Sequence, residues 1–94
     1  MRRVRLRQAE VAPNGVAGWH THPGDEISYV MEGEATWMIA GQPPRKVAAG
    51  EGFVIPAGVV HNARNDGATA AKRVGVYVVE KGQPLASPAS APAQ

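Results

Sequence analysis

Residues 20–26 read His20-Thr21-His22-Pro23-Gly24-Asp25-Glu26 and contain two of the 3 histidines of this 94-residue chain. His20 and His22 are two positions apart, so on a β-strand both imidazoles leave the same face. Pro23-Gly24 ends such a strand, and a chain that turns there can bring Glu26 back toward the imidazoles. This stretch therefore predicts two histidines and one carboxylate that face a common space from neighbouring strands.

The third histidine, His61, follows the turn sequence Pro56-Ala57-Gly58 and belongs to another strand-like run. Three neutral imidazoles and one carboxylate suit a borderline divalent metal ion. In the simpler alternative, His20 and His22 are surface residues and Glu26 is a solvated acid. We favour a metal site, because the whole histidine complement joins a glutamate at a spacing that permits convergence.

Short strand-like runs alternate with turn signals along most of the chain. The runs cover residues 16–20, 27–31, 35–40, 52–55, 59–63 and 73–80, and the breaks between them are rich in Gly, Pro, Asn and Asp. This spacing is typical of an all-β sandwich or barrel. Because no segment has a sustained helical period, we expect an all-β fold.

Composition excludes several classes of protein. A chain of 94 residues with a net charge of +2 fits one domain and does not by itself indicate nucleic acid. The absence of cysteine excludes disulfides, thiolate zinc sites, iron–sulfur clusters and a cysteine nucleophile. The Ala/Pro/Ser-rich end cannot form a core, so we expect one domain over residues 1–82 and a flexible tail over residues 83–94.

Near its start the chain alternates basic and aliphatic residues, in the order Arg3, Val4, Arg5, Leu6 and Arg7. This alternation predicts an edge strand with one charged face, where basic side chains discourage aggregation. The alternative is a phosphate or nucleic-acid site, but no aromatic residues are interleaved with the arginines. We therefore expect neither a nucleic-acid nor a membrane partner. No apolar run follows the basic start, so the expected location is cytoplasmic, or periplasmic or extracellular if a signal precedes this sequence.

The spacing of the site residues resembles the first motif of the cupin family. That motif is a Gly, five residues, His-x-His, three or four residues, Glu, six residues and Gly. His20, His22, Glu26 and Gly33 match it, whereas Asn14 occupies the position of the opening glycine. Because Asn also tolerates a positive φ, we expect the same turn there.

The second cupin motif is a Gly, five residues, Pro-x-Gly, two residues, His, three residues and Asn. The chain matches it in full with Gly50, Pro56, Gly58, His61 and Asn65. From the residue types, we expect Asn65 to be a turn residue rather than a ligand. We also expect Gly58, like Gly33, to adopt a positive φ.

The resemblance implies a cupin double-stranded β-helix, or jelly-roll barrel, with a metal site inside it. The implied ligands are His20, His22, Glu26 and His61, around one divalent ion of Fe, Mn, Ni, Co, Cu or Zn. If Glu26 faces inward, strand parity sends Ser28 and Val30 the same way, which predicts a small, mostly apolar pocket. The aromatic residues serve ordinary packing, or line the mouth of the pocket or a dimer interface: Trp19, Tyr29, Trp37, Phe53 and Tyr77.

The fold hosts many activities, so the family does not fix the function. One reading is a metal-dependent enzyme resembling quercetin dioxygenase, which acts on a small anionic or enolisable substrate with Glu26 as proton acceptor. The other is a non-catalytic module that binds a metal and a small ligand, or a sensor. Small cupins usually pair, so we expect a homodimer in which residues 4–11 or the last strand add to a neighbour's sheet.

Overall fold

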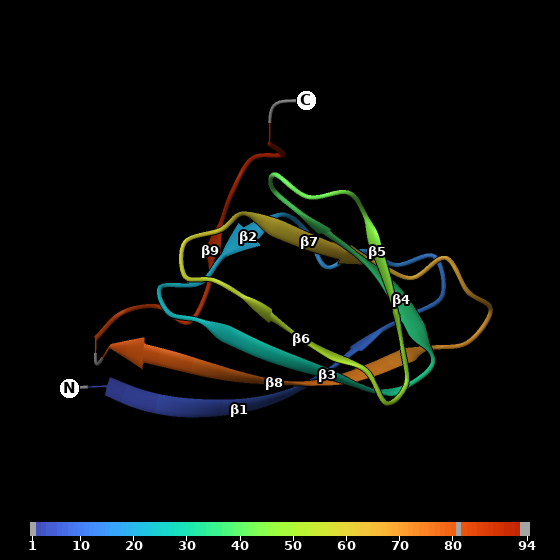
Figure 1. Cartoon of the computed structure of the whole chain (residues 1–94), viewed down its shortest axis with the longest axis horizontal. Helices are drawn as coiled ribbons and strands as arrows, with labels where there is room; N and C mark the ends of the chain where they lie inside the picture. The colour runs from blue at the N-terminus through green and yellow to red at the C-terminus, as the bar shows by residue number, and fades with distance from the viewer. Residues whose placement is uncertain (1, 81, 93–94) are drawn as a thin grey trace.

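Nine strands, arranged in two antiparallel sheets, make up the secondary structure of residues 2–80 and 82–92, which the computed structural model describes (Figure 1). In spatial order, the first sheet consists of β1 (Arg2–Val11), β8 (Ala71–Glu80), β3 (Glu26–Glu32) and β6 (Gly52–Ile55). The second consists of β5 (Arg45–Ala48), β4 (Glu34–Ile39), β7 (His61–Arg64), β2 (His20–Thr21) and β9 (Ser87–Pro88). The described residues include no helix that could span a membrane. The predicted all-β fold is confirmed.

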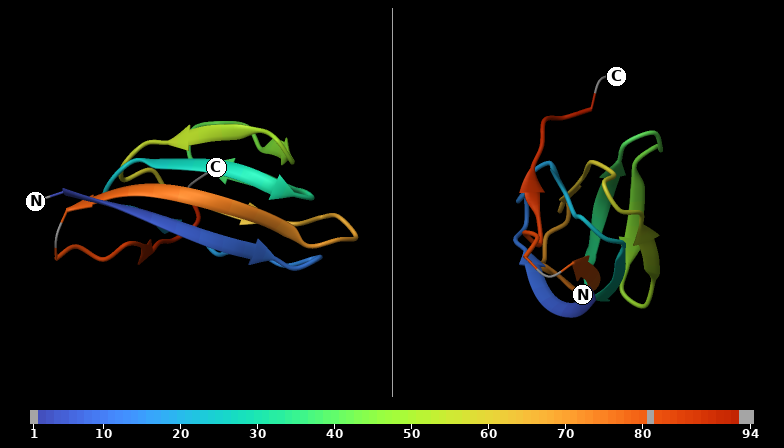
Figure 2. Two further views of the ribbon diagram at one scale, coloured as in Figure 1. Left: turned by 90° about the horizontal axis from the view of Figure 1, so that it is seen from below. Right: turned by 90° about the vertical axis from the view of Figure 1, so that its left-hand side faces the viewer.

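The predicted edge strand is β1, which pairs along its whole length with β8 (Figure 2). On its other side β8 pairs with β3. From Lys72 to Tyr77, β8 therefore has both of its edges occupied within the chain. This part of the strand is not available to add to a neighbour's sheet, and the homodimer stays a prediction.

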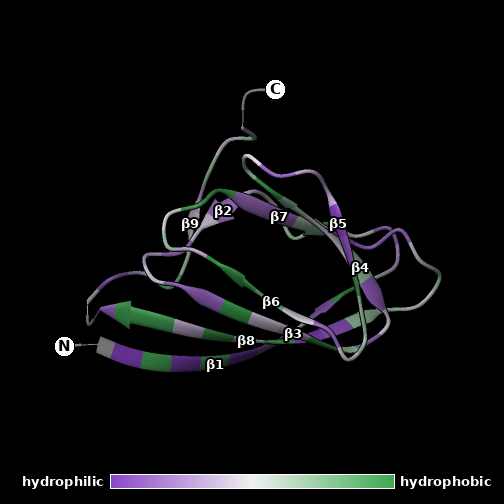
Figure 3. Cartoon of the chain, viewed as in Figure 1, coloured by the Kyte–Doolittle hydropathy of each residue, from purple (hydrophilic) through white to green (hydrophobic). Residues whose placement is uncertain are grey.

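The hydrophobic core lies between the sheets, where strands present apolar residues on alternate positions (Figure 3). Trp37 of β4 and Phe53 of β6 meet edge to face, with ring centroids 4.9 Å apart. The core consists of Val30, Ala35, Trp37, Ile39, Val47, Phe53, Ile55, Ala63 and Ala71. None of these residues belongs to β1, β2 or β9, so the part of the barrel beside those strands is not filled by this cluster.

Positive φ angles occur at the turns where the sequence predicts them. Gly33 and Gly58 have φ values of 73° and 75°, and Asn14, in the place of the motif's opening glycine, has a φ of 65°. At Gly33 a Cβ would also lie 2.6 Å from the Ala70 carbonyl oxygen. Asn65 is a buried turn residue, as predicted, whose side-chain oxygen accepts a hydrogen bond from the backbone N–H of Gly67.

The strand predicted over residues 16–20 is much shorter in the structure. Only Val16 forms a bridge, to Arg64, and the regular strand β2 begins at His20. Gly18, with a φ of 99°, breaks the extended backbone between them. An isolated glycine in a strand pattern permits such a break, but periodicity alone did not reveal it.

The segment expected to be a flexible tail contributes β9, which pairs with β2. Thr21 lies opposite Ser87, and the backbone N–H of Ala89 donates to the carbonyl oxygen of Trp19 at 3.1 Å. The domain boundary at residue 82 stays a prediction. The pairing of β9 with β2 nevertheless brings the end of the chain beside the histidines.

Candidate metal centre

The three histidines meet inside the barrel, as predicted. His20 begins β2 and lies directly opposite His61, the first residue of β7, while His22 follows the end of β2. One possible ligand atom from each imidazole lies within 4.8 Å of the others, and the rings of His20 and His61 have centroids 4.2 Å apart. This cluster could hold a metal ion.

Each imidazole is oriented by a hydrogen bond from Nδ1 to a backbone carbonyl oxygen. The acceptors are Gly18 O for His20 at 2.6 Å, Leu85 O for His22 at 2.8 Å and Val59 O for His61 at 2.9 Å. A carbonyl oxygen can only accept, so Nδ1 is the donor in each pair, and a ring that is neutral then has its lone pair on Nε2. Metal-binding histidines are commonly fixed in this way.

Burial lowers the pKa of His20 below its ordinary value, because the protonated ring would lose hydration. The hydrogen bond to Gly18 acts in the opposite direction, whereas the nearby rings of His61 and His22 lower the pKa further. The net effect favours the neutral imidazole, which is the form that binds a metal.

Glu26 begins β3 and lies beside the histidines, with an exposed fraction of 1%. Its Oε1 is 2.8 Å from Nε2 of His22 and 3.4 Å from Nε2 of His61. On the other side, Oε2 accepts a hydrogen bond from the Ser28 hydroxyl and lies 3.5 Å from Nη1 of Arg73. The parity that directs Ser28 inward with Glu26 is therefore confirmed.

The carboxylate form of Glu26 is favoured although the residue is buried. Burial alone would raise the pKa of Glu26, but its contacts with His22, His61 and Ser28, together with the charge of Arg73, hold the pKa well below its usual range. The site therefore contains a buried carboxylate whose Oε1 faces two imidazole nitrogens.

Within residues 2–80 and 82–92, three buried atoms of this site have no hydrogen-bond partner: Nε2 of His22, Nε2 of His61 and Oε1 of Glu26. Nε2 of His22 lies 2.8 Å from Oε1 of Glu26, a contact that is an ion pair when the ring is protonated. When both rings are neutral with the proton on Nδ1, the three atoms present only lone pairs to one another. Buried polar atoms without a partner are rare in proteins. Each of the three atoms can coordinate a divalent cation through its lone pair, so these residues fit a metal ion.

Sequence reasoning missed two of three further residues that shape the site, and it named the other, Tyr77, only as a residue of ordinary packing, the mouth of the pocket or a dimer interface. Nη1 of Arg73 donates to the Tyr77 hydroxyl at 3.0 Å, and the Tyr77 ring packs on His22 with centroids 4.7 Å apart. The alternation along residues 73–79 could have placed both side chains on one face. The third is Leu85, whose contribution is its carbonyl oxygen, and a backbone acceptor leaves no signal in the sequence.

The predicted aromatic residues divide between the interior and the surface. Trp37, Phe53 and Tyr77 are buried, whereas Tyr29 is 47% exposed. Trp19 lines an open hollow of about 550 Å³ together with His20. The other residues of this hollow are Ala17, Gly18, Ala86, Ser87 and Pro88. Of the three histidines, His20 is the one among the described lining residues of this hollow.

Comparisons with known proteins agree with the fold. Oxalate oxidase 1 of Hordeum vulgare is 39% identical over 79 residues, which cover 76% of this chain and 39% of that protein. Acireductone dioxygenase of Rhodopseudomonas palustris is 37% identical over 59 residues, 60% of this chain and 34% of the relative. This chain thus spans well under half the length of these relatives.

A solved structure, oxalate oxidase in complex with the substrate analogue glycolate, superimposes with a TM-score of 0.74 at 38% sequence identity. The match covers 79% of this chain and 41% of that one. The sequence model of the cupin domain matches residues 7–79, a range that includes all three histidines and Glu26. By this match and by its double-stranded β-helix, the chain belongs to the cupin family.

Proposed function

We propose that the chain is a metal-dependent enzyme of dioxygenase type that acts on a small anionic or enolisable substrate. One divalent ion of Fe, Mn, Ni, Co, Cu or Zn would be bound by His20, His22, Glu26 and His61. The observation that carries this proposal is the set of three buried lone-pair atoms without a hydrogen-bond partner. The relatives named oxalate oxidase and acireductone dioxygenase support the choice of reaction class.

The chain's own residues keep the donor atoms in place. The pairing of β2 with β7 sets His20 against His61, and the Nδ1 hydrogen bonds direct each Nε2 inward. Ser28 and Arg73 hold Oε2 of Glu26, which leaves Oε1 for the site. A bound divalent ion would supply a Lewis acid and a template for the substrate.

We assign Glu26 two roles. Its low pKa suits an ionised ligand, which is its role in the resting protein. When Oε1 is released from its neighbours, this oxygen becomes the base that accepts a proton from the substrate, while Ser28 and Arg73 still hold Oε2. Val59 and Ala63, at alternate positions on either side of His61, belong to the apolar core cluster or pack against it.

A non-catalytic module that binds a metal and a small ligand is the second candidate. Residues 34–49, between the two cupin motifs, form only β4, β5 and their turn, which leaves no inserted element to enclose a substrate. The hollow beside His20 is also open. Both observations favour reversible binding of a ligand or sensing without turnover.

Two successive measurements, of metal content and then of oxygen consumption, test the proposal. Protein purified without a histidine tag should contain about one transition metal ion per chain by elemental analysis. After anaerobic reconstitution with each metal, oxygen uptake is screened over flavonols, enediols and thiols. Binding of metal without oxygen uptake on any substrate would support the non-catalytic module, and failure to bind any metal would exclude both candidates.

The substitution His61→Ala removes one proposed metal ligand. We expect metal affinity to fall at least about a hundredfold, because direct ligands contribute more than the outer partners that typically account for 10–100-fold. The barrel should still fold, since His61 lies outside the apolar core cluster. Thr36→Ala, which removes another buried polar side chain, is the control and should retain the metal. Global unfolding of His61→Ala would instead assign the residue a structural role.

We also propose that the chain forms a homodimer. The first sheet carries an exposed apolar surface on the side away from the core, which we call the outer face. Its exposed members are Val4, Leu6, Ile27, Tyr29, Met31 and Val54. Monomeric proteins rarely leave large contiguous apolar patches in water. A second copy that presents the same face would cover it symmetrically.

A further inference from the structure

In the edge strand β1 the arginines and the aliphatic residues lie on opposite faces of the sheet, and side chains on both faces are exposed. Val4 and Leu6 are 71% and 65% exposed. Arg5 lies directly opposite Tyr77, and residues paired across antiparallel strands share one face of the sheet. Tyr77 is buried against His22, so Arg5 is on the inner face. A strand that only needed to remain soluble would place its aliphatic residues, and not its charges, on the face of the sheet that carries the buried side chains.

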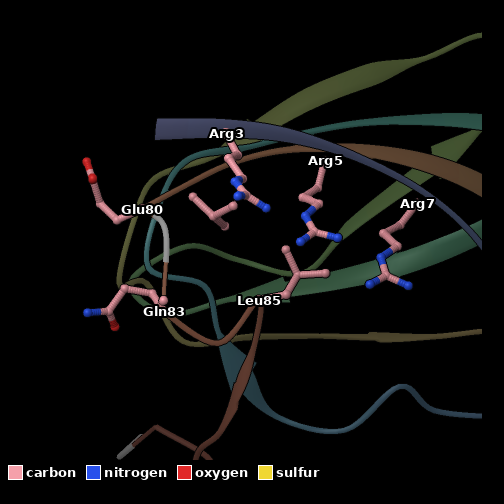
Figure 4. A pocket seen from close by; sticks show the side chains of 8 residues that line it. Arg3, Arg5, Arg7, Glu80, Gln83 and Leu85 are labelled. Atoms are coloured by element: carbon pink, nitrogen blue, oxygen red, sulfur yellow. The ribbon is translucent and has the colours of Figure 1, made fainter. Parts of the chain in front are cut away.

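The three exposed arginines line a cavity of about 210 Å³ between β1 and the segment that follows β8. Figure 4 shows the side chains of Arg3, Arg5 and Arg7 pointing in one direction, toward Leu85, whereas Glu80 and Gln83 point away from them. The described residues that line it are Arg3, Arg5, Arg7, Val79, Glu80, Gly82, Gln83 and Leu85. The side of the cavity formed by β1 is therefore strongly cationic.

No carboxylate in the described part of the chain forms an ion pair with any of these three arginines. By contrast, Arg64 pairs with Asp66 at 3.0 Å and Arg73 lies 3.5 Å from Glu26. Alternate residues of a strand are about 6.6 Å apart, so the three like charges repel one another. An anion between them would remove this repulsion.

We propose that the cavity binds a small polyanion with at least two oxyanion groups, either carboxylates or phosphates. Guanidinium groups bind both kinds of group through paired hydrogen bonds, and their spacing along β1 matches anionic groups several ångströms apart. The site requires no metal, so it goes beyond the proposed function. It is nevertheless adjacent to the metal centre, because Leu85 lines the cavity and its carbonyl oxygen holds His22.

A nucleic-acid strand is a different occupant for a row of arginines. Single strands are usually held by aromatic stacking as well as by charge, and the described lining of the cavity contains no aromatic side chain. The cavity is also bounded by the segment around Leu85, which suits a small molecule better than a continuous polymer.

Calorimetric titration of the full chain with two probes, glutarate and inorganic diphosphate, tests the site. We expect one binding event per chain, and Arg5→Gln should weaken it about tenfold or more. The triple variant Arg3→Gln, Arg5→Gln and Arg7→Gln should abolish it. Arg64→Gln removes the same charge from an arginine outside the cavity and should change the affinity less than about twofold. Thermal unfolding of each variant checks that the barrel remains folded.

The same titrations in a His61→Ala background separate this site from the metal centre. Binding that survives His61→Ala and is lost in the triple variant supports the proposal, whatever the fate of the enzymatic function. The relative affinities of the two probes distinguish carboxylate from phosphate ligands. The proposal is overturned if neither probe binds, if Arg64→Gln weakens binding as much as Arg5→Gln, or if His61→Ala alone abolishes it. Preferential binding of a single-stranded oligonucleotide through the same arginines would also overturn it.

Discussion

The carboxylate of Glu26 contacts both the histidine cluster and Arg73 inside the barrel. Its Oε1 faces the imidazoles of His22 and His61, and its Oε2 faces Arg73 and Ser28. Two of these neighbours supply positive charge or a hydrogen bond to Oε2, while the imidazoles supply only lone pairs when neutral. The Glu26 carboxylate therefore lies between the guanidinium group of Arg73 and the histidine cluster that could bind a metal.

Glu26→Gln removes the negative charge with little change of shape. We expect metal affinity to fall about tenfold or more, because the amide is a weaker ligand and Arg73 loses its charged partner. Loss of that pair should also lower the free energy of unfolding by about 3 kcal/mol. Metal titration and chemical denaturation measure the two effects. Glu34→Gln, at a half-exposed residue paired with Lys46, is the control and should change neither quantity appreciably. Unchanged metal affinity in Glu26→Gln would remove Glu26 from the ligand set.

Gly75 is the residue that leaves room for the Tyr77 ring. A Cβ at position 75 would lie 2.7 Å from the Tyr77 hydroxyl oxygen and 2.8 Å from two ring carbons. We expect Gly75→Ala to destabilise the protein by about 1–3 kcal/mol, because the ring must leave its contacts with Arg73 and His22. Thermal unfolding measures this cost. In a Tyr77→Leu background the same substitution should cost much less, and an equal cost there would place the strain elsewhere.

The site residues that the sequence predicts are those whose spacing determines which face of a strand they occupy. His20 and His22 share a face through the period of a strand, and Ser28 follows Glu26 inward by the same rule. Leu85 could not be predicted, because any residue offers a carbonyl oxygen and its position depends on how the end of the chain folds back. The sequence also could not show that Arg5 shares the face of the buried Tyr77, because alternation defines two faces of a strand without showing which one faces the core.

At the scale of elements, β2 is very short and depends on its neighbours. It comprises only His20 and Thr21, and it lies between β7 and β9. Periodicity predicted a longer strand here, because Gly18 does not disturb the pattern of apolar residues although its φ of 99° ends the extended backbone. The long strands β3 and β8 were predicted well, since their alternation is continuous and turns bound them.

The segment after β8 should therefore matter for the metal centre although it is distant in sequence. A chain that ends at residue 82 loses both β9 and the Leu85 carbonyl oxygen that orients His22. We expect this chain to fold, because the core cluster is intact, and to bind the metal roughly 10–100-fold more weakly. Metal titration compares it with a chain that ends at residue 90, which retains β9 and should bind normally. Equal affinity of the two chains would show that the segment does not support the site.

For the whole molecule, the two faces of the first sheet have different partners. The inner face meets the second sheet and the histidines, whereas the outer face is apolar and open to solvent. Ile27 lies at its centre, opposite Val76 of β8 and Val54 of β6. Such a surface favours face-to-face packing of two copies, in which no strand has to leave its own sheet. Addition of β1 to a neighbouring sheet is the competing arrangement, because β1 still has one free edge.

Ile27→Lys distinguishes these two modes of assembly. A buried lysine at the centre of a face-to-face interface would lose its hydration without a partner, so we expect this variant to be monomeric at micromolar concentrations at which the native chain is dimeric. Sedimentation velocity measures the change. Val16→Lys introduces the same charge at another exposed aliphatic residue, outside the first sheet, and should leave the dimer intact. A dimer that persists in Ile27→Lys would favour pairing through the edge of β1, and a monomeric native chain would contradict both arrangements.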